Sequence, residues 1–478
     1  MEACSRTYLI AEKRNNFALA MLIGVTISIL VLILSEATWA QTQKEKKLVL
    51  SLQQLIEMAI AKSPEMGETL SEISANQSDL DQVKAAYYPQ LESTAVVGPV
   101  GDAKRPVIRG TRIVDPSPDT IGAFGRIDFT VAQPLYTFGK LSNRREAATR
   151  GVRAKELKLE EKKNEIVLRV KELFYGLVLA RAGVDAANDA DSFFDDARRR
   201  MNRLLELGST NVSESDLYRV DAYRASTVHS RAEAEKGAKV AYFALKSLVD
   251  LSPDAEFEPA EKVLPMKEEG QADLEDYIRR AYGERPEFKQ LDEALAAQKS
   301  QIEALQSDRY PSFFVALEGS LAGAPGRETL HNAYIPDEFN HADIGIIGGI
   351  KWNFDFGISK AKVDKEKAEY ERLHYTKASA KLNIPIQVAK SYQEVKEWKV
   401  AVGAYQQAAV ASRKWVVTAL TNFDMGVGAA DDMLRAIEKY GENQGKYLES
   451  LFNYNLSVAQ LEYAVGGNPS VSGAVGSK

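Results

Sequence analysis

The stretch FTVAQPLYTFGK, residues Phe129–Lys140, joins a strand pattern to a helical pattern. At the beginning of this stretch and just before it, every second residue is apolar, namely Ile127, Phe129 and Val131. This is the period of a β-strand in a sheet with one apolar face. After Gly139, apolar residues recur at steps of three, four and seven, which is typical of a helix. The same change returns at Ile350–Ser359, IKWNFDFGIS, where Gly357 takes the place of Gly139. Two such junctions in matching contexts predict a duplicated architecture.

The two halves of the chain repeat each other at a nearly constant offset. The corresponding residues are Leu52 and Leu274, Pro64 and Pro286, Pro89 and Pro311, Gly139 and Gly357, and Gly208 and Gly426. An offset kept over so long a distance indicates internal duplication. We therefore predict a first structural repeat at 41–250, a linker at 251–273, a second repeat at 274–467 and a C-terminal tail at 468–478.

The N-terminus has the pattern of a secretory signal. The uncharged run Phe17–Leu34 follows two cationic residues, and Thr38–Ala40 offers a small-residue cleavage site, which predicts a signal peptide at 1–40. A retained membrane anchor is the alternative, because the apolar run is long for a signal. Cys4 is the only cysteine and precedes this run, so the mature chain would contain no disulfide. The formal net charge of −6 gives no reason to expect nucleic acid as a partner.

Each half carries two candidate strands, at Leu91–Val97, Gly125–Leu135, Ser312–Leu321 and Ala342–Phe354. Segments of about ten residues with one apolar face suit a transmembrane β-barrel, because lipid-facing and lumen-facing residues alternate along each strand. Ile346 is thus predicted to face lipid and Gly345 the lumen. Aromatic residues gather at one end, where an interfacial girdle would lie; they are Tyr87, Tyr88, Tyr136, Phe138, Tyr310, Trp352 and Phe356. A sheet packed on soluble helices is the alternative that alternation alone leaves open.

Two hairpins cannot close a barrel by themselves, and open sheet edges are excluded from lipid, so several chains must contribute. The segments Val100–Phe124 and Ala322–His341 are rich in glycine, proline and charge. We predict that they form loops at the end of the strands opposite the helices, outside the cell.

The remaining segments have a helical pattern. A predicted amphipathic helix covers Leu52–Tyr88, and its counterpart starts at Leu274. Two long helices and two return helices, joined at Gly208 and Gly426, are predicted at Lys140–Leu207, Glu214–Val249, Ile358–Met425 and Asp431–Val465. Their heptad-like rhythm is typical of antiparallel coiled-coil pairs. Pro385 is expected to kink or break the second long helix. The charge run Lys155–Glu172 predicts a solvated helix face.

The ordered set of these segments resembles the TolC-like outer-membrane efflux proteins, over about Leu50 to Gly467. The phrases that carry the resemblance are LSLQQLIEMAIAKSPE, AAYYPQL and QPLYTFGK in the first half, and SDRYPSF, KWNFDFG and YNLSVAQLEYAVG in the second. Each phrase is weakly specific, whereas all of them in order and in duplicate are strongly so.

The resemblance implies a mainly α fold with membrane β-structure. Four strands from each chain of a homotrimer would close one twelve-stranded barrel in the outer membrane, continued by a long periplasmic α-helical barrel with an internal two-fold repeat. The family's members are passive exit ducts, which receive drugs, metals or proteins from an inner-membrane pump of the RND, ABC or MFS type through a periplasmic adaptor. A dedicated protein-secretion conduit shares this architecture.

The resemblance also places the turns at Gly208 and Gly426 at the periplasmic tip, where such channels narrow. Asp432 aligns with the first of two acidic positions that line the constriction in related channels, and Arg435 stands where the second acid would be. Phe423 occupies a position that is commonly tyrosine in the gate network, so a possible hydrogen bond is lost.

Two further positions belong to this tip pattern. Gly428 falls where some relatives have a gate-network arginine, and Asp216 lies near the matching acidic position of the first half. The alternative interpretation is that Asp216 and Asp431 are helix N-terminal carboxylates, favoured by capping and by the helix dipole.

Enzymatic interpretations have little support in the sequence. The histidines show no metal-ligand spacing and no nucleophile signature; they are His229, His331, His341 and His374. We expect His331 and His341 to be surface residues of an external loop. No phosphate-cradling glycine loop precedes a helix, so any energy source must belong to a partner, and no cofactor is expected. The competing class is a secreted or anchored coiled-coil protein without a pore, which does not account for the two strand pairs.

Overall fold

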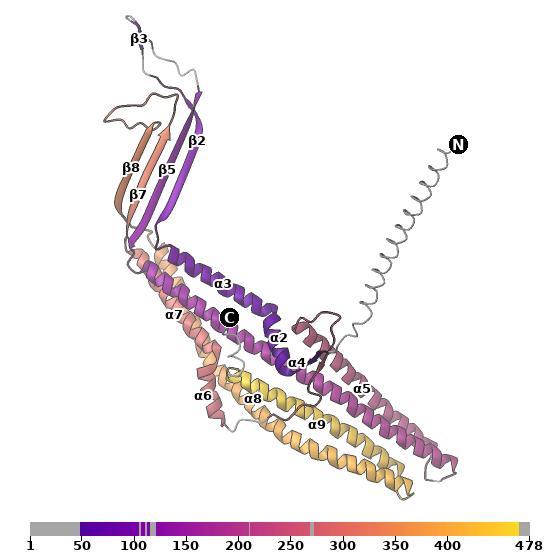
Figure 1. Ribbon diagram of the computed structural model, residues 1–478. Helices are drawn as coiled ribbons and strands as arrows, with labels where there is room; N and C mark the ends of the chain where they lie inside the picture. The colour runs from indigo at the N-terminus through magenta and orange to yellow at the C-terminus, as the bar shows by residue number, and fades with distance from the viewer. Residues whose placement is uncertain are drawn as a thin grey trace, which may run out of the picture.

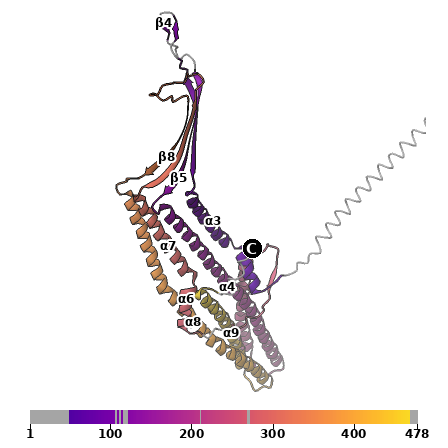
Figure 2. The ribbon, with the colours of Figure 1, turned by 60° about the vertical axis from the view of Figure 1, so that its left-hand side comes forward.

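The computed structural model describes residues 48–104, 107–109, 112–114, 121–209, 211–267 and 272–467. The predicted signal peptide at 1–40 and the tail at 468–478 lie outside the described residues. A long sheet stands at one end of the molecule, and helices lead away from it to two helical turns at the other end (Figure 1). The turned view keeps this elongated outline (Figure 2).

Both halves of the chain have the same succession of elements. The first half contains α2 (Leu52–Lys62), α3 (Pro64–Ala85), β2 (Gln90–Gly101), β5 (Ile121–Tyr136), α4 (Lys140–Glu206) and α5 (Glu214–Leu248). The second contains α6 (Leu274–Glu284), α7 (Pro286–Gln306), η1 (Ser307–Arg309), β7 (Ser312–Gly323), β8 (His341–Lys351), α8 (Ile358–Asp424) and α9 (Ala430–Val465). Short strands add β1 (Leu48–Leu50), β3 (Val107–Arg109), β4 (Arg112–Val114) and β6 (Phe257–Pro259). The predicted strands and long helices are therefore confirmed as elements.

Two prolines divide helices that the sequence predicts to be continuous, and a third lies within a helix that does not break. The predicted helix Leu52–Tyr88 divides at Ser63, because the ring of Pro64 disfavours a helical conformation in the residue before it, and Ser63 has φ −63° and ψ 125°. Arg285 before Pro286 has φ −61° and ψ 126°, so the second copy divides in the same way. Pro385, in contrast, lies inside the continuous helix α8, so the predicted break is absent. Ile384 and Val388 are buried in the hydrophobic core on either side of Pro385, and their packing opposes a helix penalty of about 3 kcal/mol.

The sheet is antiparallel, with the order β2-β5-β7-β8. Its two edge strands, β2 and β8, have no further partner among the described strands. β8 ends at Lys351 rather than at the predicted Phe354. Just after the end of the strand, the Trp352 indole N–H donates a hydrogen bond to the Arg309 carbonyl oxygen at 3.0 Å. The sheet of one chain is thus open at both edges.

The helices form two long antiparallel pairs, α4 with α5 and α8 with α9 (Figure 1). A buried stripe of residues seven apart follows α8, namely Val388, Val395, Val402, Ala409 and Val416. This spacing keeps one side of the helix against its partner, as in a coiled coil. None of the helices in the described part of the chain is long and apolar enough to cross a membrane.

The linker between the halves packs against the helices. Its strand β6 pairs in parallel with β1, so that Phe257 lies opposite Leu48. Phe257 is buried and its ring stacks on that of Tyr242, with 4.7 Å between the centroids. The linker therefore completes the hydrophobic core where the first half ends and the second begins.

Candidate functional site

One face of the sheet is apolar across all four strands. The register sets Leu91 opposite Val131, Val131 opposite Leu317, and Leu317 opposite Ile346. Ile346 is 76% exposed and Leu91 is 69% exposed in the single chain. A continuous exposed apolar face of this kind suits contact with lipid, as the sequence predicts for Ile346.

The opposite face is polar and carries several acidic residues. Two neighbouring rows across the strands carry carboxylates, with Glu92 and Glu318 in one row and Asp128 and Asp343 in the next. Gly345 lies opposite Glu318 on this face. The two faces of the sheet therefore differ in chemistry along its middle, as a wall between lipid and water requires.

A side-chain network ties this polar face together. Ser320 Oγ donates to Asp128 Oδ1 at 2.6 Å, and Arg126 Nε donates to Asp128 Oδ2 at 2.9 Å. His341 Nε2 lies 2.9 Å from Ser320 Oγ, and His341 Nδ1 lies 2.8 Å from the Asp337 carbonyl oxygen. The expectation of a surface-loop histidine is wrong for His341, because it is the first residue of β8 and is half-buried. The sequence did contain a signal for this position, because His341 lies two residues before Asp343 and so falls on the same face of β8.

The junctions between strands and long helices use left-handed backbone. Gly139 has φ +89° and Gly357 has φ +133°, and each precedes the first residue of its long helix. Phe138 and Phe356 also have positive φ, at 49° and 44°. The Phe138 ring stacks on Tyr310 at 5.3 Å between centroids, which helps to hold this uncommon conformation. Aromatic side chains thus gather where the sheet meets the helices.

The far ends of the two helical pairs are closed by glycine turns. Gly208 has φ +72° and Gly426 has φ +76°. After Gly426, the backbone N–H of Gly428 donates to the Asn422 carbonyl oxygen at 3.0 Å. A Cβ at position 428 would lie 2.8 Å from the Phe423 backbone nitrogen, so no side chain fits there while the turn keeps this shape. The turn therefore accounts for glycine at position 428, where the resemblance predicts a gate-network arginine in some relatives.

Arginine–aspartate pairs join the two helical turns. Asp431 accepts hydrogen bonds from Arg219 of α5 and from Arg435 of its own helix. The hydrogen bond from Arg219 is the main reason that the pKa of Asp431 lies below its usual value. A second bridge runs from Arg200 on α4 to Asp424 on α8. These pairs hold the ends of the two helical hairpins together.

The predicted tip residues occupy different environments. Asp432 is half-buried, and its carboxylate has no ion pair among the described residues. Arg435, which stands where the resemblance predicts a second acid, pairs with Asp431, one residue before Asp432. Asp216 Oδ2 accepts the Ser213 backbone N–H at 3.0 Å, which is the helix-capping role of the alternative interpretation. Phe423 is buried in the hydrophobic core of the tip.

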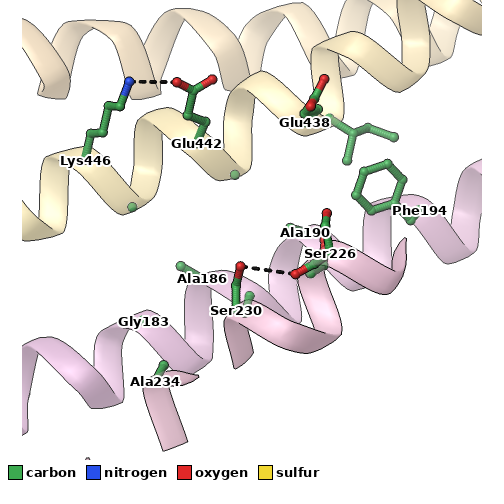
Figure 3. A pocket seen from close by; sticks show the side chains of 15 residues that line it. Gly183, Ala186, Ala190, Phe194, Ser226, Ser230, Ala234, Glu438, Glu442 and Lys446 are labelled. Carbon is green, nitrogen blue, oxygen red and sulfur yellow. Dashed lines mark hydrogen bonds and ion pairs between the residues drawn. The ribbon is translucent and has the colours of Figure 1, made fainter. Parts of the chain in front are cut away.

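Above the tip, α4, α5 and α9 enclose a groove of about 480 Å³ (Figure 3). Small residues make its walls, among them Gly183, Ala190, Ser230 and Gly441, and Phe194 closes one end. Glu442 stands at the rim, where ion pairs with Lys439 and Lys446 lower its pKa to about 2. Periodicity did not predict this groove, because it depends on three helices meeting at small side chains.

The charge run on α4 is only partly solvated, so the prediction for Lys155–Glu172 needs correction. Lys171 is buried, and its Nζ donates to Glu462 Oε2 on α9 at 2.6 Å. Lys267 of the linker donates to the other oxygen of Glu462 at 3.2 Å. Burial lowers the pKa of Lys171, while the two lysines outweigh the effect of burial on Glu462 and hold its pKa below the usual value. This network joins the linker to α4 and α9.

The described side chains include no group of histidine, cysteine and carboxylate that could hold a metal ion.

Comparison with known proteins gives a consistent picture. A sequence profile of the outer membrane efflux protein family matches residues 55–240 and 277–467. Among solved structures, CusC is similar with a TM-score of 0.72 and 17% identity, covering 88% of this chain and 94% of that one. VceC from Vibrio cholerae, described as an outer membrane protein, has a TM-score of 0.70 and 17% identity, covering 87% and 96%. The MtrE outer membrane channel of Neisseria gonorrhoeae, solved in an open state, has a TM-score of 0.69 and 16% identity, covering 87% and 89%. No curated protein sequence matches significantly.

Proposed function

The chain belongs to the outer membrane efflux protein family, and on that premise we propose that it is the outer-membrane exit duct of a tripartite efflux or type I secretion system. In this proposal the duct is passive. An inner-membrane pump of the RND, ABC or MFS type supplies energy, and a periplasmic adaptor joins the two.

The open sheet is the observation that carries the proposal. Its apolar face suits lipid and its polar face suits water, yet both of its edges are unpaired within the described chain. Lipid offers no hydrogen bonds to the free N–H and C=O groups of an edge strand, so β2 of one chain must pair with β8 of another. Three chains of four strands each would close a barrel of twelve strands.

The helices support the same assembly. α8 carries exposed apolar side chains away from its buried stripe; those more than half exposed include Tyr375, Leu382, Ile386, Val400, Val410 and Val417. Burial of such a surface is worth about 25 cal/mol per Å². Contact with a neighbouring chain would bury it and continue the barrel as a helical tunnel through the periplasm.

The groove and the helical turns at the tip are the surfaces at which we propose that the adaptor binds. The groove between α4, α5 and α9 has small residues in its walls and charges at its rim, which suits the close approach of a helix from an adaptor. Asp432, whose carboxylate has no partner in the described chain, is proposed to line the narrow opening at the tip. Three-fold symmetry would then bring three such carboxylates around one axis.

The alternative of a coiled-coil protein without a pore fits this chain less well, because it gives no reason for a sheet with one lipid-compatible face and two open edges. The mass of the detergent-solubilised protein, measured by light scattering with the detergent subtracted, tests the proposal. Three chains of 52.8 kDa each, less the signal peptide, are expected in the outer-membrane fraction. A detergent-independent monomer would contradict it.

A further inference from the structure

A second cavity, of about 700 Å³, lies where the sheet meets the helices. Its walls come from the end of α3, the adjoining ends of all four sheet strands, and the start of α4. Gln90, Ala132 and Phe314 lie on the same face of the sheet as Glu92, Asp128 and Glu318, because they are an even number of residues away along each strand. The cavity therefore continues the polar face toward the helices.

An aromatic ring forms the floor of this cavity. Phe314 lies opposite Gly349 on β8 and opposite Pro134 on β5. A Cβ at Gly349 would lie 2.4 Å from the Phe314 ring, so the ring covers the glycine backbone. The register shifts between Pro134 and Tyr136, and such an irregularity re-aims a strand locally. The ring thus occupies the space that a side chain at position 349 would fill.

The charges around the cavity have one sign. Lys140 and Lys351 are among its lining residues, and no acidic residue is. Lys140 Nζ lies 2.5 Å from Asp308 Oδ1, so its charge is partly neutralised. Lys351 is exposed and has no ion pair among the described residues. The Gln90 side-chain NH₂ group donates hydrogen bonds to the Ala85 and Tyr88 carbonyl oxygens at 3.0 Å each, so both of its N–H donors are engaged within the chain.

An apolar floor with an adjacent cation fits one class of ligand. We propose that this cavity is a resting site for amphipathic anions, meaning molecules with an aromatic body and a single sulfonate or carboxylate, on their way through the duct. The aromatic body would stack on Phe314 and the anion would lie beside Lys351. The carboxylates of the next rows, Glu92 and Glu318, repel an anion, so the molecule pauses before it enters the acidic stretch. The inference rests on the proposed function, because the polar face must line a lumen.

Single-channel recording on the purified full-length protein tests this inference, with 1-naphthalenesulfonate as the probe on the helical side. 1-Naphthylmethylammonium, which has a similar aromatic body and the opposite charge, is the control probe. We expect the sulfonate to produce resolved blocks of the current. Lys351→Gln should shorten the block by about fivefold, as loss of one partly exposed ion pair predicts. Phe314→Leu should shorten it by about tenfold, because the flat stacking surface is lost.

Lys367→Gln is the matched control, since Lys367 is an exposed lysine on α8 outside the cavity. The duration of the sulfonate block should be unchanged in this variant. Normal open-channel conductance with equal block by both probes would overturn this inference and leave the exit duct standing. So would block that neither Lys351→Gln nor Phe314→Leu alters. Absence of conductance in the unmodified protein would instead overturn the proposed function, and the inference with it.

Discussion

Replacing Ile346 by arginine should prevent the chain from assembling in the outer membrane. Ile346 is near the middle of β8, on the apolar face, opposite Leu317. An arginine that faces lipid near the bilayer midplane costs about 2–4 kcal/mol. A trimer repeats this cost in every chain, which gives about 6–12 kcal/mol for the assembly. That penalty is comparable to the whole stability of many domains.

Gly345→Arg is the matched control, because it places the same side chain one residue away on the polar face, opposite Glu318. A Cβ at Gly345 would meet no atom within 4 Å, so the substitution has space. The assay is the amount of heat-sensitive trimer in the outer-membrane fraction, seen on a gel with and without boiling. We expect trimer from Gly345→Arg and little or none from Ile346→Arg. Equal assembly of both variants, or failure of Gly345→Arg alone, would refute the assignment of the two faces.

Three further predictions concern the helical part. Lys171→Met should lower the free energy of unfolding by about 2 kcal/mol, because Glu462 loses a buried charged hydrogen bond. Thermal unfolding followed by circular dichroism should show a lower midpoint for Lys171→Met and a smaller decrease for Lys171→Arg. Equal midpoints for the unmodified protein and both variants would contradict this prediction. Hydrogen bonds from Lys155 and Lys158 lower the pKa of Glu72 from 4.5 to about 2, so its stabilising effect is full above pH 4.5 and is lost as the pH falls toward 2. The gap between the melting temperatures of the unmodified protein and Glu72→Gln should close over that interval, and a constant gap would disprove the linkage. Asp432→Ala should weaken cation preference, measured as the reversal potential in a salt gradient, without changing trimer yield; an unchanged potential would place Asp432 away from the constriction.

Much of the fold could be predicted because apolar residues recur with the period of a strand or of a helix along most of the chain. Alternation around Phe129 and Ile346 predicts strands, and the seven-residue step through Val388 and Val395 predicts a long helix. These patterns report which side of an element is apolar, so they also predict which face of the sheet suits lipid. They depend only on local backbone geometry, which sequence spacing captures directly.

The errors arose where a feature depends on contacts between distant elements. Lys171 looks like any residue of a solvated charge run, and only Glu462, far away in sequence, makes its burial possible. Arg435 can reach Asp431 or Asp432 from its own helix, and it pairs with Asp431, which also contacts Arg219 of the neighbouring hairpin. The groove and the cavity depend on three or more elements meeting, which no single stretch of sequence records.

Single-channel recording of the purified protein in a planar lipid bilayer would show directly whether three chains form one pore. We expect small, stable conductance steps, each arising from one assembly of three chains whose sheets close a barrel. The same sample should contain trimers that dissociate on heating. A folded monomer that is soluble without detergent and produces no conductance would show that the chain is not an outer-membrane duct.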